Sequence, residues 1–120
     1  MRAWPETTVL VTGGRGFLGQ AVCARLNRRG VGRLVTPGSA EYDLRRADEV
    51  ARLLADTRPD LISHLAARVG GIGANQAAPA DLYLDNLLMG THVIEQARLA
   101  GIPKTVVAGT ICSYPKHTPV

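Results

Sequence analysis

The stretch Thr12-Gly13-Gly14-Arg15-Gly16-Phe17-Leu18-Gly19 decides how this chain folds, and it follows directly on the apolar run Val9-Leu10-Val11. The apolar run predicts a buried strand. Glycines at this spacing allow a tight turn from a strand into a helix and let the backbone approach a pyrophosphate closely. The helix start adds free N–H groups and the positive end of a dipole. The stretch therefore predicts a site for the diphosphate of a dinucleotide; a glycine turn that serves packing alone is the alternative.

The rest of the chain alternates short apolar runs with helical periodicity, around a glycine-rich loop at 70–73. We expect strands at 7–12, 34–35, 60–67 and 105–109, and helices at 17–29, 47–57 and 79–100. A β-α-β-α-β-α-β succession predicts a parallel sheet with right-handed crossovers. The fold class is thus α/β, a Rossmann-type sheet with flanking helices. We expect the first half of a doubly wound fold, with strand order 3-2-1-4, in one domain over residues 1–120. Its last strand should form an open apolar edge.

The composition favours a small globular protein. Hydrophobic residues make up 46% of the 120 residues, and no apolar stretch is long enough to span a membrane. The net charge is +4, but the arginines are scattered, so no nucleic-acid partner is expected. The first six residues lack the apolar segment of a secretory signal, which favours the cytoplasm. Cys23 and Cys112 form no disulfide framework and are expected to be reduced thiols.

The choice of dinucleotide depends on the end of the second strand. An acidic residue there favours NAD because it binds the ribose hydroxyls, and residues 36–39 contain none. Arg15 could pair with a 2′-phosphate and Ser39 could donate a hydrogen bond, so we expect NADP(H), with NAD(H) left open. A solvent-exposed turn residue is the alternative reading of Arg15.

Several stretches outside the glycine turn resemble one family. They are His64-Leu65-Ala66-Ala67-Arg68-Val69-Gly70-Gly71-Ile72, Asn75, Asp85-Asn86-Leu87, Gly90-Thr91 and Gly109-Thr110-Ile111-Cys112-Ser113-Tyr114-Pro115-Lys116. Together they resemble the GDP-L-fucose synthases, which are extended short-chain dehydrogenases/reductases. The resemblance covers nearly the whole chain. It implies that a GDP-4-keto-6-deoxy sugar is epimerised at two ring carbons and then reduced with NADPH.

The resemblance also implies roles for individual residues. The dinucleotide diphosphate would be held by Gly13, Arg15, Gly16, Phe17, Leu18 and Gly19. Adenine would touch Asp43 and Leu44, the cofactor would lie along Leu65, Ala66 and Ala67, and Asn86 would support the catalytic centre. Thr110 stands where the family usually has its catalytic serine, and its hydroxyl can still donate to a ketone. Cys112 matches the acid/base of the epimerisation; a small packed residue is the alternative.

One catalytic element of the family is missing from these 120 residues. A Tyr-x-x-x-Lys pair shares one helical face because of its spacing, whereas Tyr114-Pro115-Lys116 has the wrong spacing and a proline. The family's second acid/base, a histidine, is not matched either. We therefore expect the cofactor-binding half of such an enzyme, without a substrate domain, inactive alone and homodimeric in a full-length protein. Another nucleotide-sugar epimerase or dehydratase, and a non-catalytic dinucleotide-binding module, remain alternatives.

Overall fold

A computed structural model describes residues 3–110, 113–115 and 117. After a short 3-10 turn (Trp4–Glu6), the strands are β1 (Thr8–Thr12), β2 (Arg33–Val35), β3 (Leu61–His64) and β4 (Lys104–Val107). The helices are α1 (Phe17–Arg28), α2 (Ala47–Thr57), α3 (Ile72–Ala77) and α4 (Pro79–Leu99). The alternation expected from the sequence is confirmed, and α2 has the expected bounds.

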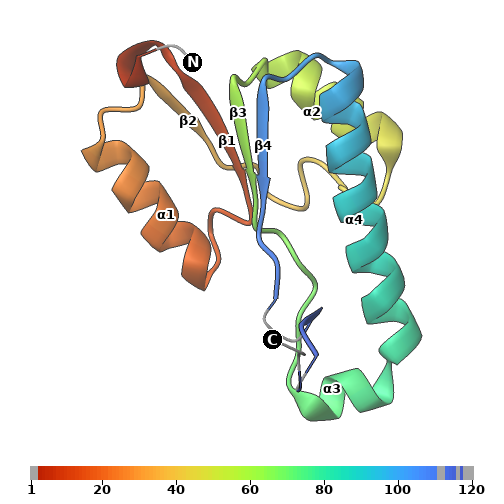
Figure 1. Ribbon diagram of the computed structural model, residues 1–120. Coiled ribbons are helices and arrows are strands. Elements are labelled where there is room, and N and C mark those ends of the chain that lie inside the picture. The colour runs from red at the N-terminus through yellow and green to blue at the C-terminus, as the bar shows by residue number, and fades with distance from the viewer. Residues whose placement is uncertain (1–2, 111–112, 116, 118–120) are drawn as a thin grey trace.

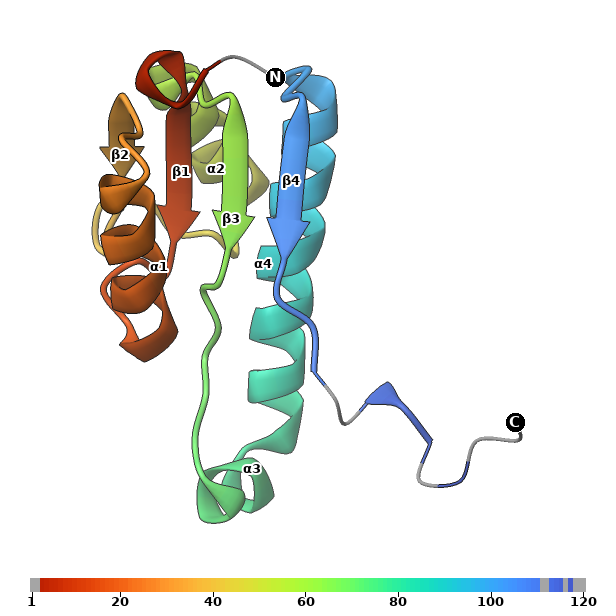
Figure 2. The same ribbon diagram turned by 60° about the vertical axis from the view of Figure 1, so that its left-hand side comes forward.

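The four strands form one parallel sheet with helices on both faces. Its order is β2-β1-β3-β4, and every neighbouring pair is parallel, so that all four arrows point the same way (Figure 2). The helix α1 covers one face, and α2 and α4 cover the other (Figure 1). The α/β fold with a parallel, doubly wound sheet is therefore confirmed.

The order of the strands differs from the expected 3-2-1-4. The third strand pairs with β1, with Leu10 opposite Ile62, instead of extending the sheet beyond β2. The reason lies in burial. All four residues of β3 are buried, whereas β2 has three residues, of which Arg33 is exposed. A strand buried on both faces gains most from a central position, so β3 lies inside the sheet and β2 at its edge.

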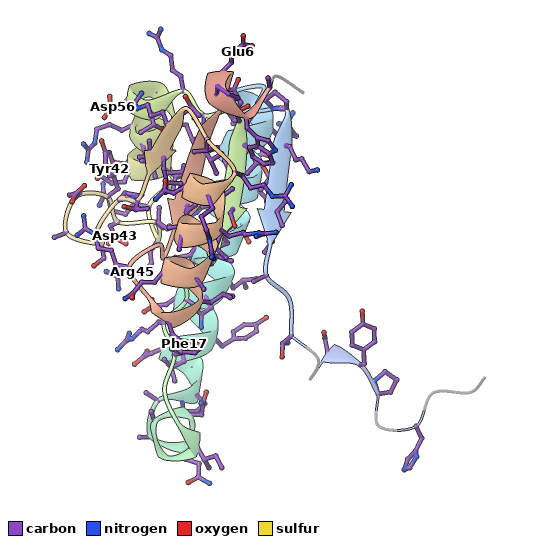
Figure 3. All side chains as sticks on the ribbon, turned by 90° about the vertical axis from the view of Figure 1, so that its left-hand side faces the viewer. Glu6, Phe17, Tyr42, Asp43, Arg45 and Asp56 are labelled. Carbon is purple, nitrogen blue, oxygen red and sulfur yellow. The ribbon has the colours of Figure 1, made fainter. Side chains whose placement is uncertain are left out.

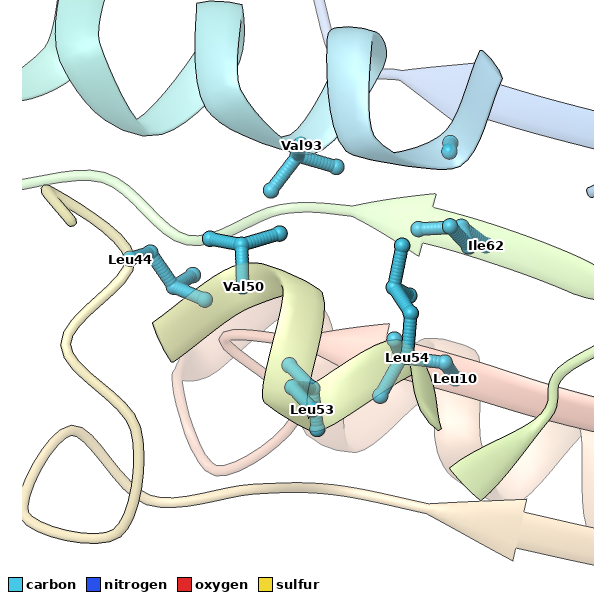
Figure 4. Packing of buried hydrophobic residues seen from close by; sticks show 8 residues of the cluster. Leu10, Leu44, Val50, Leu53, Leu54, Ile62 and Val93 are labelled. Carbon is cyan, nitrogen blue, oxygen red and sulfur yellow. The ribbon is translucent and has the colours of Figure 1, made fainter. Parts of the chain in front are cut away.

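The core is split by the sheet into two clusters. Between the sheet and helices α2 and α4, a cluster of eight buried residues packs together (Figure 4): Leu10, Leu44, Val50, Leu53, Leu54, Ile62, Val93 and Ala97. On the other face, Val9 and Val11 pack with Leu61 against side chains that include Cys23 and Leu26 of α1. Successive residues of β1 therefore enter opposite clusters, which explains its uninterrupted apolar run.

Two details depart from expectation. The last two residues of the loop expected at 70–73 instead begin a short helix, α3, and the strand expected at 60–67 ends at His64. Residues 65–67 instead continue beyond the sheet. The expected open edge is confirmed in the described part of the chain, where β4 is the last strand and Val106 and Val107 are each 45% exposed.

Candidate functional site

The parallel sheet brings four chain segments to one edge. They follow the carboxyl ends of the strands: the glycine turn after β1, residues 36–39 after β2, residues 65–67 after β3 and residues 108–110 after β4. The strands β2 and β3 lie on opposite sides of β1, so the direction in which the chain adds strands to the sheet reverses at β1. Ligands of open α/β sheets bind in the crevice at such a reversal.

Three glycines of the turn are required by packing. Gly13 has a positive φ of 70°, and a Cβ there would lie 2.7 Å from the backbone nitrogen of Ala66. A Cβ at Gly14 would lie 2.6 Å from Cγ2 of Thr36, and one at Gly19 would fall against the carbonyl oxygen of Gly13. The turn therefore packs closely between the segments that follow β2 and β3, and Gly13 lies beside Leu65 and Ala66.

Gly16 is different. Its φ is −79°, a value open to any residue, and in the described part of the chain a Cβ there would meet Gly13 O alone, at 3.3 Å. This contact is closer than ordinary van der Waals distance, but packing demands glycine less here than at Gly13, Gly14 and Gly19, where a Cβ would come within 2.7 Å of another atom. A ligand that approaches the backbone closely would make that demand.

The start of α1 can receive an anion. The Gly16 carbonyl accepts the first helical hydrogen bond, from the Gln20 N–H at 2.9 Å, so the preceding N–H groups of the first turn have no partner within the helix. The helix has no side-chain cap and no acidic residue in its first turn. Phe17 is 99% exposed and Leu18 53% exposed at the same end, and Figure 3 labels Phe17 there. Free N–H groups, a dipole and Gly16 together fit the diphosphate of a dinucleotide.

Arg15 reaches toward the end of β2. Its Nη2 lies 3.2 Å from Oε1 of Glu41, and a Cβ on Gly38 would lie 2.9 Å from Arg15 Nη1. Residues 36–39 contain no acid, and the prediction of the cofactor did not include Glu41, two residues farther along the chain. The signal was available, because the acid of a dinucleotide site is expected about 20 residues after the glycines.

Behind the turn, a buried polar pair joins β1 to β3. Thr12 Oγ1 and His64 Nδ1 share a hydrogen bond of 2.7 Å, and the Ala66 N–H donates to the same Oγ1 at 3.3 Å. Burial lowers the pKa of His64, so the ring is neutral at pH 7. His64 thus holds the strand ends together, with Leu65 and Ala66 half-buried and Ala67 exposed beyond it.

The predicted adenine contacts separate into a surface residue and a core residue. Asp43 accepts hydrogen bonds from the backbone N–H and the guanidinium of Arg45, which hold the pKa of Asp43 below its usual range. Figure 3 shows these two side chains on one side of the molecule. Leu44 is 8% exposed and belongs to the core, so little of its side chain is open to a ligand.

Asn86 clamps the segment after β3. Its Oδ1 accepts from the Arg68 N–H at 2.7 Å, and its Nδ2 donates to the Arg68 carbonyl at 2.8 Å. The neighbouring Asp85 bridges two loops, with Arg68 at 2.7 Å and Arg45 at 3.6 Å. These ion pairs were not expected from the sequence, since their partners lie on separate elements. A groove of about 490 Å³ runs beside Asn86 between α3 and α4.

The two predicted catalytic residues lie past β4. Thr110 is exposed, and its carbonyl accepts hydrogen bonds from the Ser113 N–H at 3.2 Å and the Ser113 hydroxyl at 2.5 Å. Cys112 lies outside the described residues. Among residues 3–110, 113–115 and 117, no group of His, Cys, Asp and Glu is placed to hold a metal ion. In the same part of the chain, no helix is both long and apolar enough to cross a membrane.

Comparison with known proteins places this geometry in a family. The chain is 38% identical over 111 residues to GDP-L-fucose synthase 1 of Arabidopsis thaliana, covering 92% of this chain and 34% of that protein. A GDP-L-fucose synthetase from Naegleria fowleri bound to NADP is 30% identical, with a TM-score of 0.79 over 97% of this chain and 34% of that one. A GDP-D-glycero-L-gluco-heptose synthase from Campylobacter jejuni, in the presence of NADPH, is 28% identical, with a TM-score of 0.88 over 99% of this chain and 34% of that one.

The chain thus spans about a third of the length of the curated relatives it matches. The model of the NAD dependent epimerase/dehydratase family matches residues 9–120, from β1 through the glycine turn to the segment that contains Thr110 and Cys112. This match covers all four strands, so this chain belongs to the NAD dependent epimerase/dehydratase family.

Proposed function

We propose that this chain is the cofactor-binding half of an NADP(H)-dependent nucleotide-sugar epimerase/reductase of the GDP-L-fucose synthase type. The observation that carries the proposal is Gly16, where packing demands glycine less than at Gly13, Gly14 and Gly19, at the uncapped start of α1. A bound diphosphate explains it, because a side chain at this position would hold the phosphates away from the helix N–H groups.

NADP(H) is favoured over NAD(H) by Arg15 and Ser39. A guanidinium pairs with phosphate through two parallel hydrogen bonds, which makes it suited to a 2′-phosphate. A Cβ on Gly38, the residue before Ser39, would lie 2.9 Å from Arg15 Nη1, so Arg15 reaches the segment after β2, where the adenosine ribose would lie. The Naegleria fowleri relative was solved with NADP, and the Campylobacter jejuni relative with NADPH.

The roles of the remaining residues follow from their chemistry. When bound, the nicotinamide would supply the hydride for the reduction of a keto sugar. Thr110 would donate a hydrogen bond to the keto oxygen, and Cys112 would move a proton at the epimerised carbon. Asn86 would keep the segment after β3 in place through its two hydrogen bonds to Arg68.

Calorimetric titration with NADPH tests the cofactor site directly. The variant Gly16→Ala adds one methyl group, 3.3 Å from Gly13 O and farther from the other described atoms beyond its chain neighbours and the nearby helix backbone, and it should weaken NADPH binding at least about tenfold. Gly90→Ala, on α4, is the matched control and should bind like the parent chain. Among the described residues, no atom outside its chain neighbours and the nearby backbone of α4 would lie within 4 Å of its added methyl. Equal affinity of all three proteins would refute the diphosphate site.

Turnover tests the reaction. A protein that continues this chain with a Tyr-x-x-x-Lys pair should oxidise NADPH with GDP-4-keto-6-deoxymannose, while the 120-residue chain alone should not. Because Thr110 replaces the usual serine, another nucleotide-sugar epimerase or dehydratase is a second candidate. A panel of nucleotide sugars distinguishes the two, and activity with a different sugar alone would favour the second.

A further inference from the structure

Glu41 and Arg15 form an ion pair across the end of β2. Arg15 Nη2 lies 3.2 Å from Glu41 Oε1. A Cβ on Gly38, between them, would lie 2.9 Å from Arg15 Nη1 and 3.2 Å from Glu41 Oε1. The two side chains are 69% and 55% exposed, so both charges are open to a ligand at this edge of the sheet.

The backbone that carries Glu41 is held firmly. The N–H groups of Glu41 and Tyr42 both donate to the Gly38 carbonyl, at 3.0 and 3.2 Å. Arg52 of α2 donates to the Glu41 carbonyl at 2.8 Å, and its guanidinium stacks 4.3 Å from the centre of the Tyr42 ring. The Tyr42 hydroxyl donates to Asp56 at 2.9 Å, and both side chains are labelled together in Figure 3. Glu41 is therefore anchored on α2, while Arg15 comes from the glycine turn.

We propose that Glu41 is a specificity-determining residue that competes with the 2′-phosphate of NADP(H) for Arg15. This inference rests on the proposed function. A carboxylate at the end of the second strand accepts hydrogen bonds from the ribose hydroxyls of NAD, and an arginine there accommodates the 2′-phosphate of NADP. Here the two groups are paired with each other. NADPH has to displace Glu41 from Arg15 and then lie beside its negative charge, whereas NADH leaves the pair intact.

The pair therefore narrows the preference for NADPH that Arg15 alone would confer. A 2′-phosphate carries nearly two negative charges, and a carboxylate about 5 Å away in a solvated site lowers its affinity by roughly five- to tenfold. The variant Glu41→Gln keeps the shape of the side chain and removes its charge. It should tighten NADPH binding by about that factor and leave NADH binding unchanged or weaker.

The test is the ratio of the dissociation constants of NADH and NADPH, measured by calorimetry on the parent chain and three variants. Glu41→Gln should raise this ratio about fivefold or more, and Arg15→Gln should lower it. In the double variant, the effect of Glu41→Gln should shrink to less than half, since no guanidinium remains to be released. Glu95→Gln, which removes a carboxylate from an exposed pair with Arg98 on α4, is the matched control and should leave the ratio unchanged.

The outcomes separate the two proposals. If the parent chain binds both dinucleotides and Glu41→Gln leaves the ratio unchanged or lowers it, the role of Glu41 is wrong and the cofactor site stands. If the parent chain binds neither dinucleotide, the proposed function is wrong and the role of Glu41 is lost with it. A fivefold gain that appears equally in Glu95→Gln would show a general effect of net charge and would also overturn the inference.

Discussion

Replacing Gly19 by alanine should destabilise the protein, although alanine is the better helix former. Gly19 is the third residue of α1 and is buried. A Cβ there would fall against Gly13 O and lie 2.6 Å from Gly14 Cα, whereas carbon atoms in contact are about 3.5–4.0 Å apart. The start of α1 would have to move by about 1 Å from the turn. Such overpacking costs about 3 kcal/mol, and the gain in helix propensity returns about 1 kcal/mol, so the free energy of unfolding should fall by about 2 kcal/mol.

Urea and thermal unfolding, followed by circular dichroism, measure this difference. A loss of about 2 kcal/mol lowers the Tm of a domain of this size by roughly 8 °C. Gly90→Ala is the matched control, since Gly90 also lies within a helix. In the part of the chain that the structure describes, no atom beyond its chain neighbours and the nearby helix backbone would lie within 4 Å of the added methyl, so this variant should raise the stability by up to about 1 kcal/mol. If Gly19→Ala is as stable as the parent chain, the close packing of turn and helix described above is incorrect.

Three other residues, His64, Asn86 and Ile62, allow further measurable predictions. Burial lowers the pKa of His64 in the folded protein below the usual value of 6.5, so the unfolded chain binds a proton more readily than the folded one. The free energy of unfolding should therefore have its full value above pH 6.5 and fall at lower pH, by at most about 1.4 kcal/mol per pH unit. Urea titrations at several pH values should show this slope, and His64→Gln should flatten it. Asn86→Ala removes both hydrogen bonds to Arg68 and should cost about 1 kcal/mol; unchanged hydrogen exchange at the Arg68 amide would contradict this. Ile62→Ala empties a fully buried position and should cost about 2–5 kcal/mol in urea unfolding, and a loss below about 1 kcal/mol would mean that the core there is loosely packed.

Local sequence patterns predicted most of the helices and strands, because the formation of a helix or strand depends largely on residues that are close in the chain. The helix at 47–57 was predicted with its observed bounds, since its apolar residues share one helical face and Pro59 follows it. The helix α3 was missed because Gly70, Gly71 and Gly73 make a weak helical sequence. Asn75 compensates: its side-chain amide donates to the carbonyls of Gly70 and Gly71, at 3.0 and 3.1 Å.

The candidate site was predicted in part for the same reason. The glycine turn is a local feature, and its residues lie together at the end of β1. The ion pair of Glu41 with Arg15 was not predicted because it spans 26 residues, and the hydrogen bonds between Asn86 and Arg68 join two elements that the sequence does not relate. Contacts of this kind depend on where the loops lie once the strands have paired.

By itself the sequence determined that β1 would be buried, that glycines would turn the chain into a helix, and that strands and helices would alternate in a parallel sheet. These properties follow from side-chain polarity and backbone freedom over a few residues. Only the tertiary structure decided that β3 pairs with β1, and that Glu41 faces Arg15 at the end of β2. The order of the strands and the positions of the loops depend on how the whole chain buries its apolar surface, so no single stretch of sequence determines them.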